Sequence, residues 1–179
     1  MTINPALRED VRRRAQFACE FCGIHEIDAG GELTIDHYQP KSKGGDDSLD
    51  NLIYCCFRCN QYKLDYWPEH ADHPSLWNPR REPALQHFLE IDEGTLHPLT
   101  TIGAFTIERL RLNRLSLVAH RIRKHQQIQQ AHLLADYRDY TRFIETLVSQ
   151  QAMAISEQQK LSDFLRKLLL LFLGGKNND

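Results

Sequence analysis

Two pairs of closely spaced cysteines are the residues whose types and spacing most directly suggest chemistry. Cys19 and Cys22 form one pair, Cys56 and Cys59 the other, and two residues separate the members of each. Two such pairs can supply the four sulfur ligands of a tetrahedral structural zinc ion, and unrelated buried cysteines are the alternative. The fifth cysteine, Cys55, directly precedes a ligand, so we expect it to pack in the core.

An aspartate–histidine pair, Asp36 and His37, lies between the cysteine pairs and follows residues 32–35, whose alternating pattern predicts a short strand. Because imidazole titrates near neutral pH, His37 can act as a general base toward water. Asp36 offers a hard oxygen ligand for a catalytic Mg²⁺ or Mn²⁺ ion. Neighbouring strand residues point to opposite faces, so we expect a distorted strand end that presents both side chains to one cleft. Together they could hydrolyse a phosphodiester bond with one metal ion.

Further spacings around this pair carry a family resemblance. They comprise Pro40, Gly44-Gly45, Asn51-Leu52, Asn60 and Lys63, in register with both cysteine pairs. Residues 15 to 65 thereby resemble the HNH endonuclease family of the four-cysteine zinc type. The resemblance implies an α+β chain with a ββα-metal core and a DNA endonuclease that leaves a 5′-phosphate and a 3′-hydroxyl. It also implies that Asn60, at a position where histidine is frequent, is the second protein ligand of the catalytic cation, and that Asn51 holds the loop that orients His37.

Basic residues flank this segment. Lys41, Lys43, Arg58 and Lys63 are expected to contact DNA phosphates, and ordinary solubilising charge is the alternative. Basic residues also crowd the start of the C-terminal region, where a DNA-backbone contact competes with a solvated helix face: Arg109, Arg111, Arg114, Arg121, Arg123 and Lys124.

The bulk composition limits the class of protein. A net charge of −2 excludes a protein that coats nucleic acid over its whole surface but leaves room for a local basic site. The first residues lack the apolar stretch of a signal peptide. The longest apolar run, residues 168–173, is shorter than the ~20 residues of a membrane span. We therefore expect a cytoplasmic protein whose cysteines stay reduced and which does not enter a membrane.

Three regions are expected along the chain: an HNH nuclease core with the cysteine pairs (1–75), an irregular and hairpin extension (76–103) and an α-helical region (104–179). Asn4 and Pro5 predict the start of a helix that reaches about Phe17. Residues 87–91 and 95–99 predict a hairpin with a three-residue loop that ends at Gly94. In the last region, Ser116, Thr141 and Ser156 are candidate caps for two or three helices.

An apolar stripe near the C-terminus should be buried, either within the chain or against a homodimer or protein partner; it comprises Leu161, Phe164, Leu165, Leu168, Leu169 and Phe172. Two alternatives to a free-standing nuclease follow from these features. One is a non-catalytic, zinc-dependent DNA-binding module, and the other is a nuclease subunit that docks to a partner through its helical region.

Overall fold

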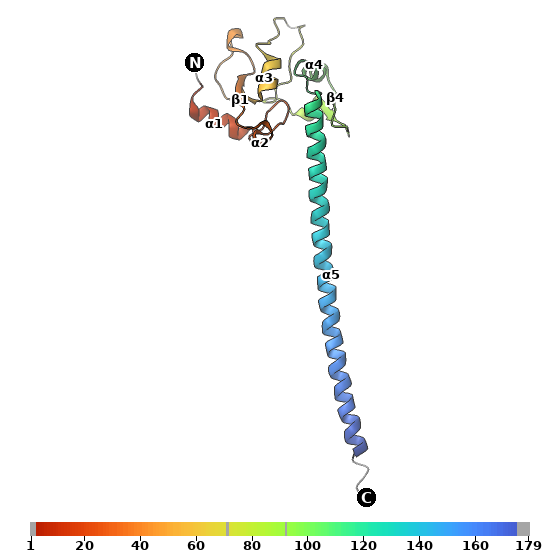
Figure 1. Cartoon of the computed structure of the whole chain (residues 1–179). Helices are drawn as coiled ribbons and strands as arrows, with labels where there is room; N and C mark the ends of the chain where they lie inside the picture. Colours follow the sequence, from red (N-terminus) through yellow and green to blue (C-terminus); the bar gives the residue numbers. More distant parts are fainter. Residues whose placement is uncertain (1–2, 71, 92, 175–179) are drawn as a thin grey trace. The chain divides into compact units, whose positions relative to one another are not determined.

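The structure is a computed structural model that describes residues 3–70, 72–91 and 93–174 (Figure 1). The chain divides into two compact units, one up to His125 and one from Gln126 onward. In chain order the helices and strands are α1 (Pro5–Arg14), α2 (Glu26–Ala29), β1 (Thr34–His37), β2 (Leu52–Cys55), α3 (Phe57–Lys63), β3 (Phe88–Glu90), β4 (Leu96–Pro98), α4 (Thr101–Arg109) and α5 (Leu115–Gly174), with short 3₁₀ turns at Lys41–Lys43 and Ala84–Gln86.

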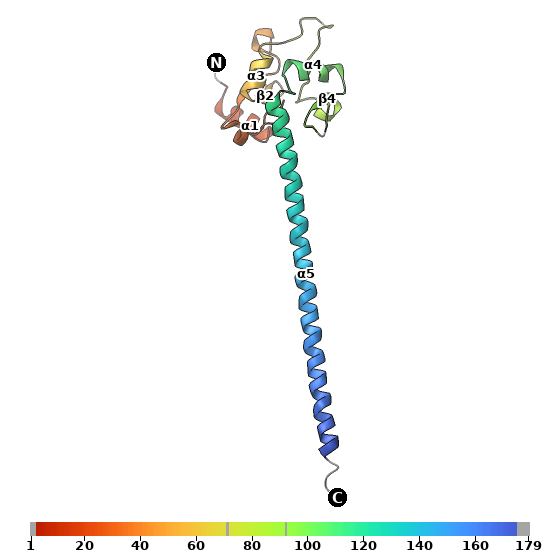
Figure 2. The same ribbon diagram turned by 45° about the vertical axis from the view of Figure 1, so that its right-hand side comes forward.

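A two-stranded sheet and one helix form the centre of the first unit. β1 and β2 pair antiparallel, with Thr34 opposite Cys55 and His37 opposite Leu52. All four residues of β2 are buried, which explains why this strand is continuously apolar rather than alternating. α3 packs against β1, and α1 packs against β2 (Figures 1 and 2). This ββα arrangement with the cysteine pairs at its base confirms the predicted fold class.

The first helix begins where the sequence predicts and ends earlier. The side chain of Asn4 accepts from the backbone N–H of Ala6, the expected N-cap. The helix ends at Arg14 rather than near Phe17, because Gln16 and Phe17 have φ angles of 51° and 60°, which a right-handed helix cannot accommodate.

A partly buried ion pair joins α1 to α2. Arg12 Nε and Nη2 each lie 2.7 Å from one carboxylate oxygen of Glu26, and the hydroxyl of Tyr54 also donates to this carboxylate. The Arg12 hydrogen bonds lower the pKa of Glu26 to about 2. Glu26 thus stays ionised well below the pH at which a free glutamate gains a proton.

The predicted hairpin forms from β3 and β4, with Phe88 opposite Pro98. Gly94 has a φ of 69°, as expected of the last loop residue, and a Cβ there would lie 2.8 Å from the carbonyl oxygen of Val118. Asp92, the first residue of the expected loop, lies outside the described residues. The hairpin shares one apolar core with the ββα centre, since Phe88 belongs to the same buried cluster as Val11.

The expected α-helical region contains most of α4 and then α5, which begins one residue before the predicted cap Ser116. From Leu115 to Gly174 α5 is uninterrupted, so the predicted helix boundaries at Thr141 and Ser156 are wrong. The hydroxyl of Thr141 donates to the carbonyl of Tyr137, four residues earlier in the same helix, instead of capping a new one. The expected burial of the apolar stripe within the chain is also wrong, because Leu165 and Phe172 are 53% and 78% exposed. None of the described helices has an apolar stretch of the length that a bilayer crossing requires.

Candidate active site and metal centre

The four paired cysteines converge in the first unit. Cys19 and Cys22 lie on a turn after α1, and Cys56 and Cys59 lie at the start of α3. Their sulfur atoms all fall within 4.8 Å of one another, and Cys22 Sγ is 3.7 Å from Cys56 Sγ. Four sulfurs at the Zn–S distance of a tetrahedral site are separated by about 3.8 Å. The cysteines are therefore arranged for a metal ion such as zinc.

The protonation of these thiols also fits a cation. Cys19 is buried, which opposes ionisation, but hydrogen bonds from the neighbouring thiols outweigh burial and lower its pKa. The pKa values of Cys22 and Cys59 are raised, chiefly because their thiols hydrogen-bond to Cys19. The protein alone therefore favours few thiolates in this space, whereas a divalent cation would allow all four to ionise. Cys55 points into the core as expected and is fully buried.

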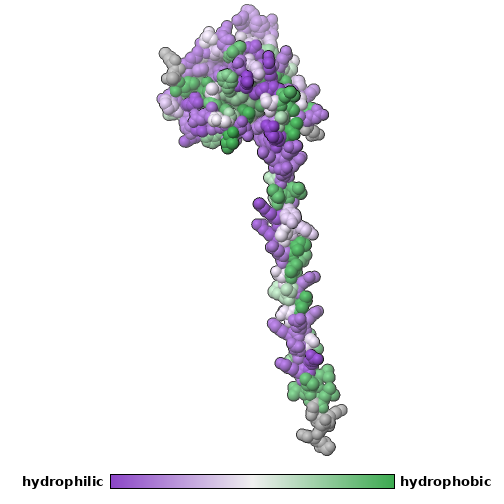
Figure 3. Space-filling model, in the orientation of Figure 1, coloured by the Kyte–Doolittle hydropathy of each residue, from purple (hydrophilic) through white to green (hydrophobic). Residues whose placement is uncertain are grey.

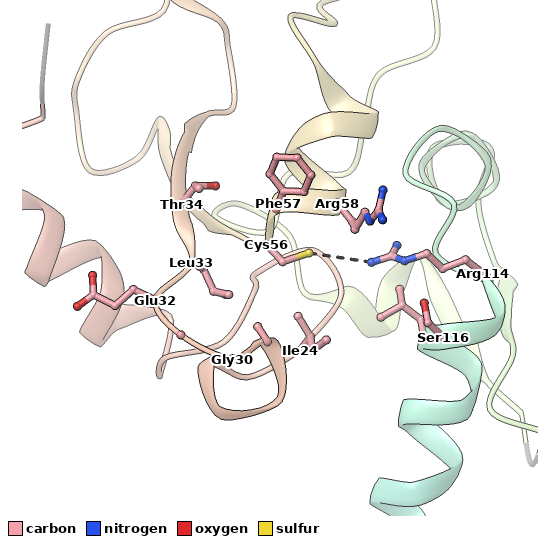
Figure 4. A pocket seen from close by; sticks show the side chains of 13 residues that line it. Ile24, Gly30, Glu32, Leu33, Thr34, Cys56, Phe57, Arg58, Arg114 and Ser116 are labelled. Carbon is pink, nitrogen blue, oxygen red and sulfur yellow. Dashed lines mark hydrogen bonds between the residues drawn. The ribbon is translucent and has the colours of Figure 1, made fainter.

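An arginine from beyond α4 lies against the sulfur cluster. Arg114 Nη2 is 4.0 Å from the sulfurs of Cys56 and Cys59, and the contact with Cys56 is the dashed line in Figure 4. Burial would lower the pKa of Arg114, but the charge of Cys59 and its neighbours raises it. Arg114 and Cys56 border a cavity of ≈340 Å³ that Ile24, Leu33 and other apolar side chains also line (Figure 4). Neither Asp36 nor His37 lines this cavity.

Asp36 and Asn60 both belong to the region where α3 packs on β1. Asn60 Nδ2 donates to Thr34 Oγ1 at 3.5 Å, and Lys63, one turn later, lies 2.9 Å from Asp36 Oδ2. Thr34 and Asp36 share a face of β1 because they are two residues apart. Asp36 Oδ2 is buried, and among the described residues it has no hydrogen-bond donor, because the lysine contact is an ion pair without hydrogen-bond geometry. Two hard oxygen donors, from Asp36 and Asn60, therefore share one side of the strand.

His37 leaves β1 in another direction. The strand pairs regularly through His37, so the distorted strand end that we expected is absent, and Asp36 and His37 project to opposite faces. His37 Nε2 lies 2.7 Å from Asp47 Oδ1, and Lys41 Nζ lies 2.7 Å from the other oxygen of Asp47. The hydrogen bond from Lys41 and, to a lesser extent, the one from His37 lower the pKa of Asp47. Asp47 therefore stays ionised beside the imidazole.

Lys63 contacts both Asp36 and the backbone of His37. Its ammonium donates to the carbonyl oxygen of His37 at 2.7 Å while it pairs with Asp36. The His37 main chain and the Asp36 carboxylate thus meet at one cation on the side of β1 that α3 covers.

Asn51 holds the loop between β1 and β2. Its side-chain oxygen accepts from Gln39 N–H at 2.8 Å, and its amide nitrogen donates to the carbonyls of Gln39 and Asp46. Gly45 lies inside this loop so closely that a Cβ would be 1.8 Å from the Gln39 carbonyl oxygen. Asn51 therefore fixes the backbone next to Asp47, although no atom of it bonds the imidazole.

The predicted phosphate contacts differ in exposure. Lys41 and Lys43 are partly exposed and pair with Asp47 and Glu69. Arg58 is exposed at the start of α3. Lys63 is fully buried, so a direct contact with DNA does not fit this structure.

Two arginines of the predicted basic cluster bond to backbone carbonyls of the first unit. Arg121 donates to the carbonyls of Gly94 and Leu112, and Arg109 donates to the carbonyl of Lys63. A DNA-backbone role does not fit Arg121, which is buried.

The structure gives two residues a place at the site that the sequence did not assign to them. Asp47 and Arg114 gain their contacts only through folding, ten residues from His37 and 58 residues from Cys56. A charged residue at such a separation gives no local signal in the sequence. Asp47 could have been suspected only from its place in the acidic turn after Gly45.

Comparison with known families supports the motif. Residues 19–65 match the family model for HNH endonuclease, which confirms the resemblance over that segment. The match covers the four cysteines, Asp36, His37 and Asn60, and it indicates a nuclease or nucleic-acid-binding family. No curated protein matches the chain.

Proposed function

We propose that this protein is a metal-dependent endonuclease that hydrolyses phosphodiester bonds in DNA. The observation that carries the proposal is the match of residues 19–65 to the HNH family. Within that segment the Asp36 carboxylate and Asn60 lie on the side of β1 that α3 covers, and the next residue of the strand is His37. A zinc-binding module that only bound DNA would need neither the His37–Asp47 contact nor the Asp36 carboxylate and the Asn60 amide on the α3 side of β1.

Asp36 and Asn60 are the proposed ligands of a divalent cation. A carboxylate oxygen and an amide oxygen are hard donors of the kind that Mg²⁺ and Mn²⁺ accept. The ion pair with Lys63 holds the Asp36 carboxylate on the side of β1 that α3 covers. When bound, the cation supplies positive charge that stabilises the negative charge developing on the phosphate and on the leaving oxygen.

His37 is the proposed general base. An ionised Asp47 accepts the Nε2 proton of the neutral imidazole, which leaves the lone pair on Nδ1 to take a proton from water. The water oxygen then bonds to phosphorus, the bond from phosphorus to the 3′ oxygen breaks, and that oxygen takes a proton from solvent water to become the 3′-hydroxyl. Asn51 acts on this step at a distance, since it holds the loop that carries Asp47.

DNA would reach this site across exposed charge. Lys41, Lys43 and Arg58 are the proposed phosphate contacts, because each carries a cation at the surface of the matched segment. The buried Lys63 instead positions Asp36 and the His37 backbone.

A cleavage assay tests the proposal. Wild-type protein, His37→Ala and the control His97→Ala, which changes an exposed histidine of β4, are incubated with linear, supercoiled and single-stranded DNA in Mg²⁺, Mn²⁺ or chelator. We expect cation-dependent cutting by the wild type and the control, and a loss of at least about a hundredfold in His37→Ala with unchanged zinc content. DNA retention in a gel shift with no cutting in any metal would instead support the non-catalytic binding module.

A further inference from the structure

The part of α5 from Gln126 onward exposes a large apolar surface. Green side chains run along this part of the helix in Figure 3. Leu133, Tyr137 and Leu161 are 70%, 68% and 60% exposed. Such a surface on a helix of this length is unstable in water unless another chain covers it.

The apolar residues follow a seven-residue repeat. From Leu133 to Phe172 they alternate at spacings of four and three, the pattern of a coiled-coil seam. The seam has twelve positions, ten apolar and two glutamine: Leu133, Tyr137, Tyr140, Ile144, Leu147, Gln151, Ala154, Gln158, Leu161, Leu165, Leu168 and Phe172. The register holds without a break over the whole segment, so one partner helix could cover all of it.

We propose that this seam pairs with the same segment of a second copy of the chain, parallel and in register. The inference does not depend on the nuclease proposal, because it uses only residues beyond His125.

The two glutamines identify the partner. Gln151 and Gln158 occupy equivalent positions in consecutive repeats, where an apolar partner would leave a buried amide without hydrogen bonds. In a parallel pair in register, each glutamine faces its own copy, and the two amides can bond to each other. Polar residues at such positions are known to fix register and orientation in coiled coils.

An antiparallel pairing of the same seam is less suitable. Overlapping the two ends places Leu133 opposite Phe172 of the second copy and Leu147 opposite Gln158. That contact buries an amide against an aliphatic side chain, and symmetry repeats it in the second half of the pair.

The residues beside the seam agree with the parallel arrangement. In a parallel pair, the residue that precedes every second seam position (the positions equivalent to Gln151 and Gln158) approaches the residue five places later in the second copy. Phe143 then meets Val148, and Phe164 meets Leu169, so that four side chains between 58% and 60% exposed gain apolar partners. Glu157 meets Ser162 at the polar middle of the segment. Along most of the interface, apolar side chains therefore face apolar ones and polar side chains face polar ones.

Sedimentation equilibrium on the full chain tests the pairing. We expect the wild type to have twice the single-chain mass of 20.9 kDa at micromolar concentrations. The double variant Leu161→Asp, Leu165→Asp places charge in the seam and should pair at least about a hundredfold more weakly. The matched control Leu170→Asp changes a leucine on the opposite side of the helix and should pair like the wild type. A single-chain mass for the wild type, a mass of three or more chains, or equal pairing by both variants would overturn the proposal.

Disulfide formation tests the orientation. Leu133→Cys places a thiol in the seam, where it meets its own copy in a parallel pair but lies roughly 60 Å from it in an antiparallel one, given the rise of an α-helix. Ala135→Cys, two residues away and outside the seam, is the control. Oxidised dimers from Leu133→Cys should exceed those from the control and from wild-type protein with its native cysteines. Equal dimer yields in all three proteins would contradict the parallel arrangement.

Discussion

The unit up to His125 buries its apolar side chains, whereas the part of α5 beyond it leaves them exposed. In the first unit β2 is buried on both faces, and its neighbours include a cluster of sulfurs suited to an ion. In the second, side chains such as Tyr140 and Leu169 are more than half exposed. A short segment that cannot bury enough surface by itself gains stability from a bound ion, whereas a long helix with a repeating stripe gains it from another helix. Local composition alone does not reveal which solution a chain uses.

The largest effect on stability is expected from a substitution in the sulfur cluster of the first unit. Cys56→Ser removes a ligand from the proposed zinc site, and we expect loss of zinc and of cooperative unfolding in the first unit, since structural zinc contributes on the order of 10 kcal/mol. Cys55→Ala, at the adjacent buried cysteine, should keep zinc and lose only about 1 kcal/mol. Metal analysis and thermal unfolding distinguish the two. A Cys56→Ser protein that melts like the wild type would show that the ion does not stabilise this unit.

A smaller effect comes from the buried lysine of the same unit. Lys63→Met leaves Asp36 without its ion-pair partner and the His37 carbonyl without its donor, so we expect a loss of about 3 kcal/mol in the free energy of unfolding. Lys43→Met removes an exposed lysine that is 3.4 Å from Glu69 and should cost less than about 0.5 kcal/mol. Urea unfolding measures both. Equal losses would mean that Lys63 is not the internal cation of the structure.

The smallest effect is expected for the Arg12–Glu26 ion pair, whose contribution to the stability of the first unit changes only at acid pH. The Arg12 hydrogen bonds lower the pKa of Glu26 from 4.5 to about 2, so its ionised form stabilises the fold fully above pH 4.5. That contribution is lost as the pH falls from 4.5 toward 2. The stability difference between wild type and Glu26→Gln should therefore be constant near neutral pH and shrink below pH 4.5. A difference that persists unchanged at the acid end would refute the role of this ion pair.

The spacing of residues in the sequence predicted part of the site, and the remaining contacts depend on how the elements pack. The cysteine pairs and the strand β1 follow from local patterns, because the spacing of paired ligands and the alternation of a strand are fixed by short-range geometry. Lys63 was predicted to contact phosphates, yet its position three residues after Asn60 turns it to the same side of α3, toward Asp36. Only the packing of that helix on β1 reveals this.

The C-terminal helix shows the converse error. Thr141 and Ser156 have the composition of helix caps, but a hydroxyl inside a helix can bond to the carbonyl four residues earlier, as Thr141 does. Capping residues therefore indicate a helix end only where the apolar periodicity also stops. In this chain the seven-residue repeat continues through both positions.

The dependence of cleavage on cation concentration tests the central claim most directly, since it measures the proposed ligands rather than the base. Initial rates of DNA cutting are compared for wild type and Asn60→Ala over a range of Mn²⁺ concentrations, with Gln61→Ala as the control on the next residue of α3. We predict that wild type and control saturate alike and that Asn60→Ala needs at least about tenfold more Mn²⁺. Identical curves for all three proteins, or wild-type cutting that persists in chelator, would contradict a catalytic cation held between β1 and α3.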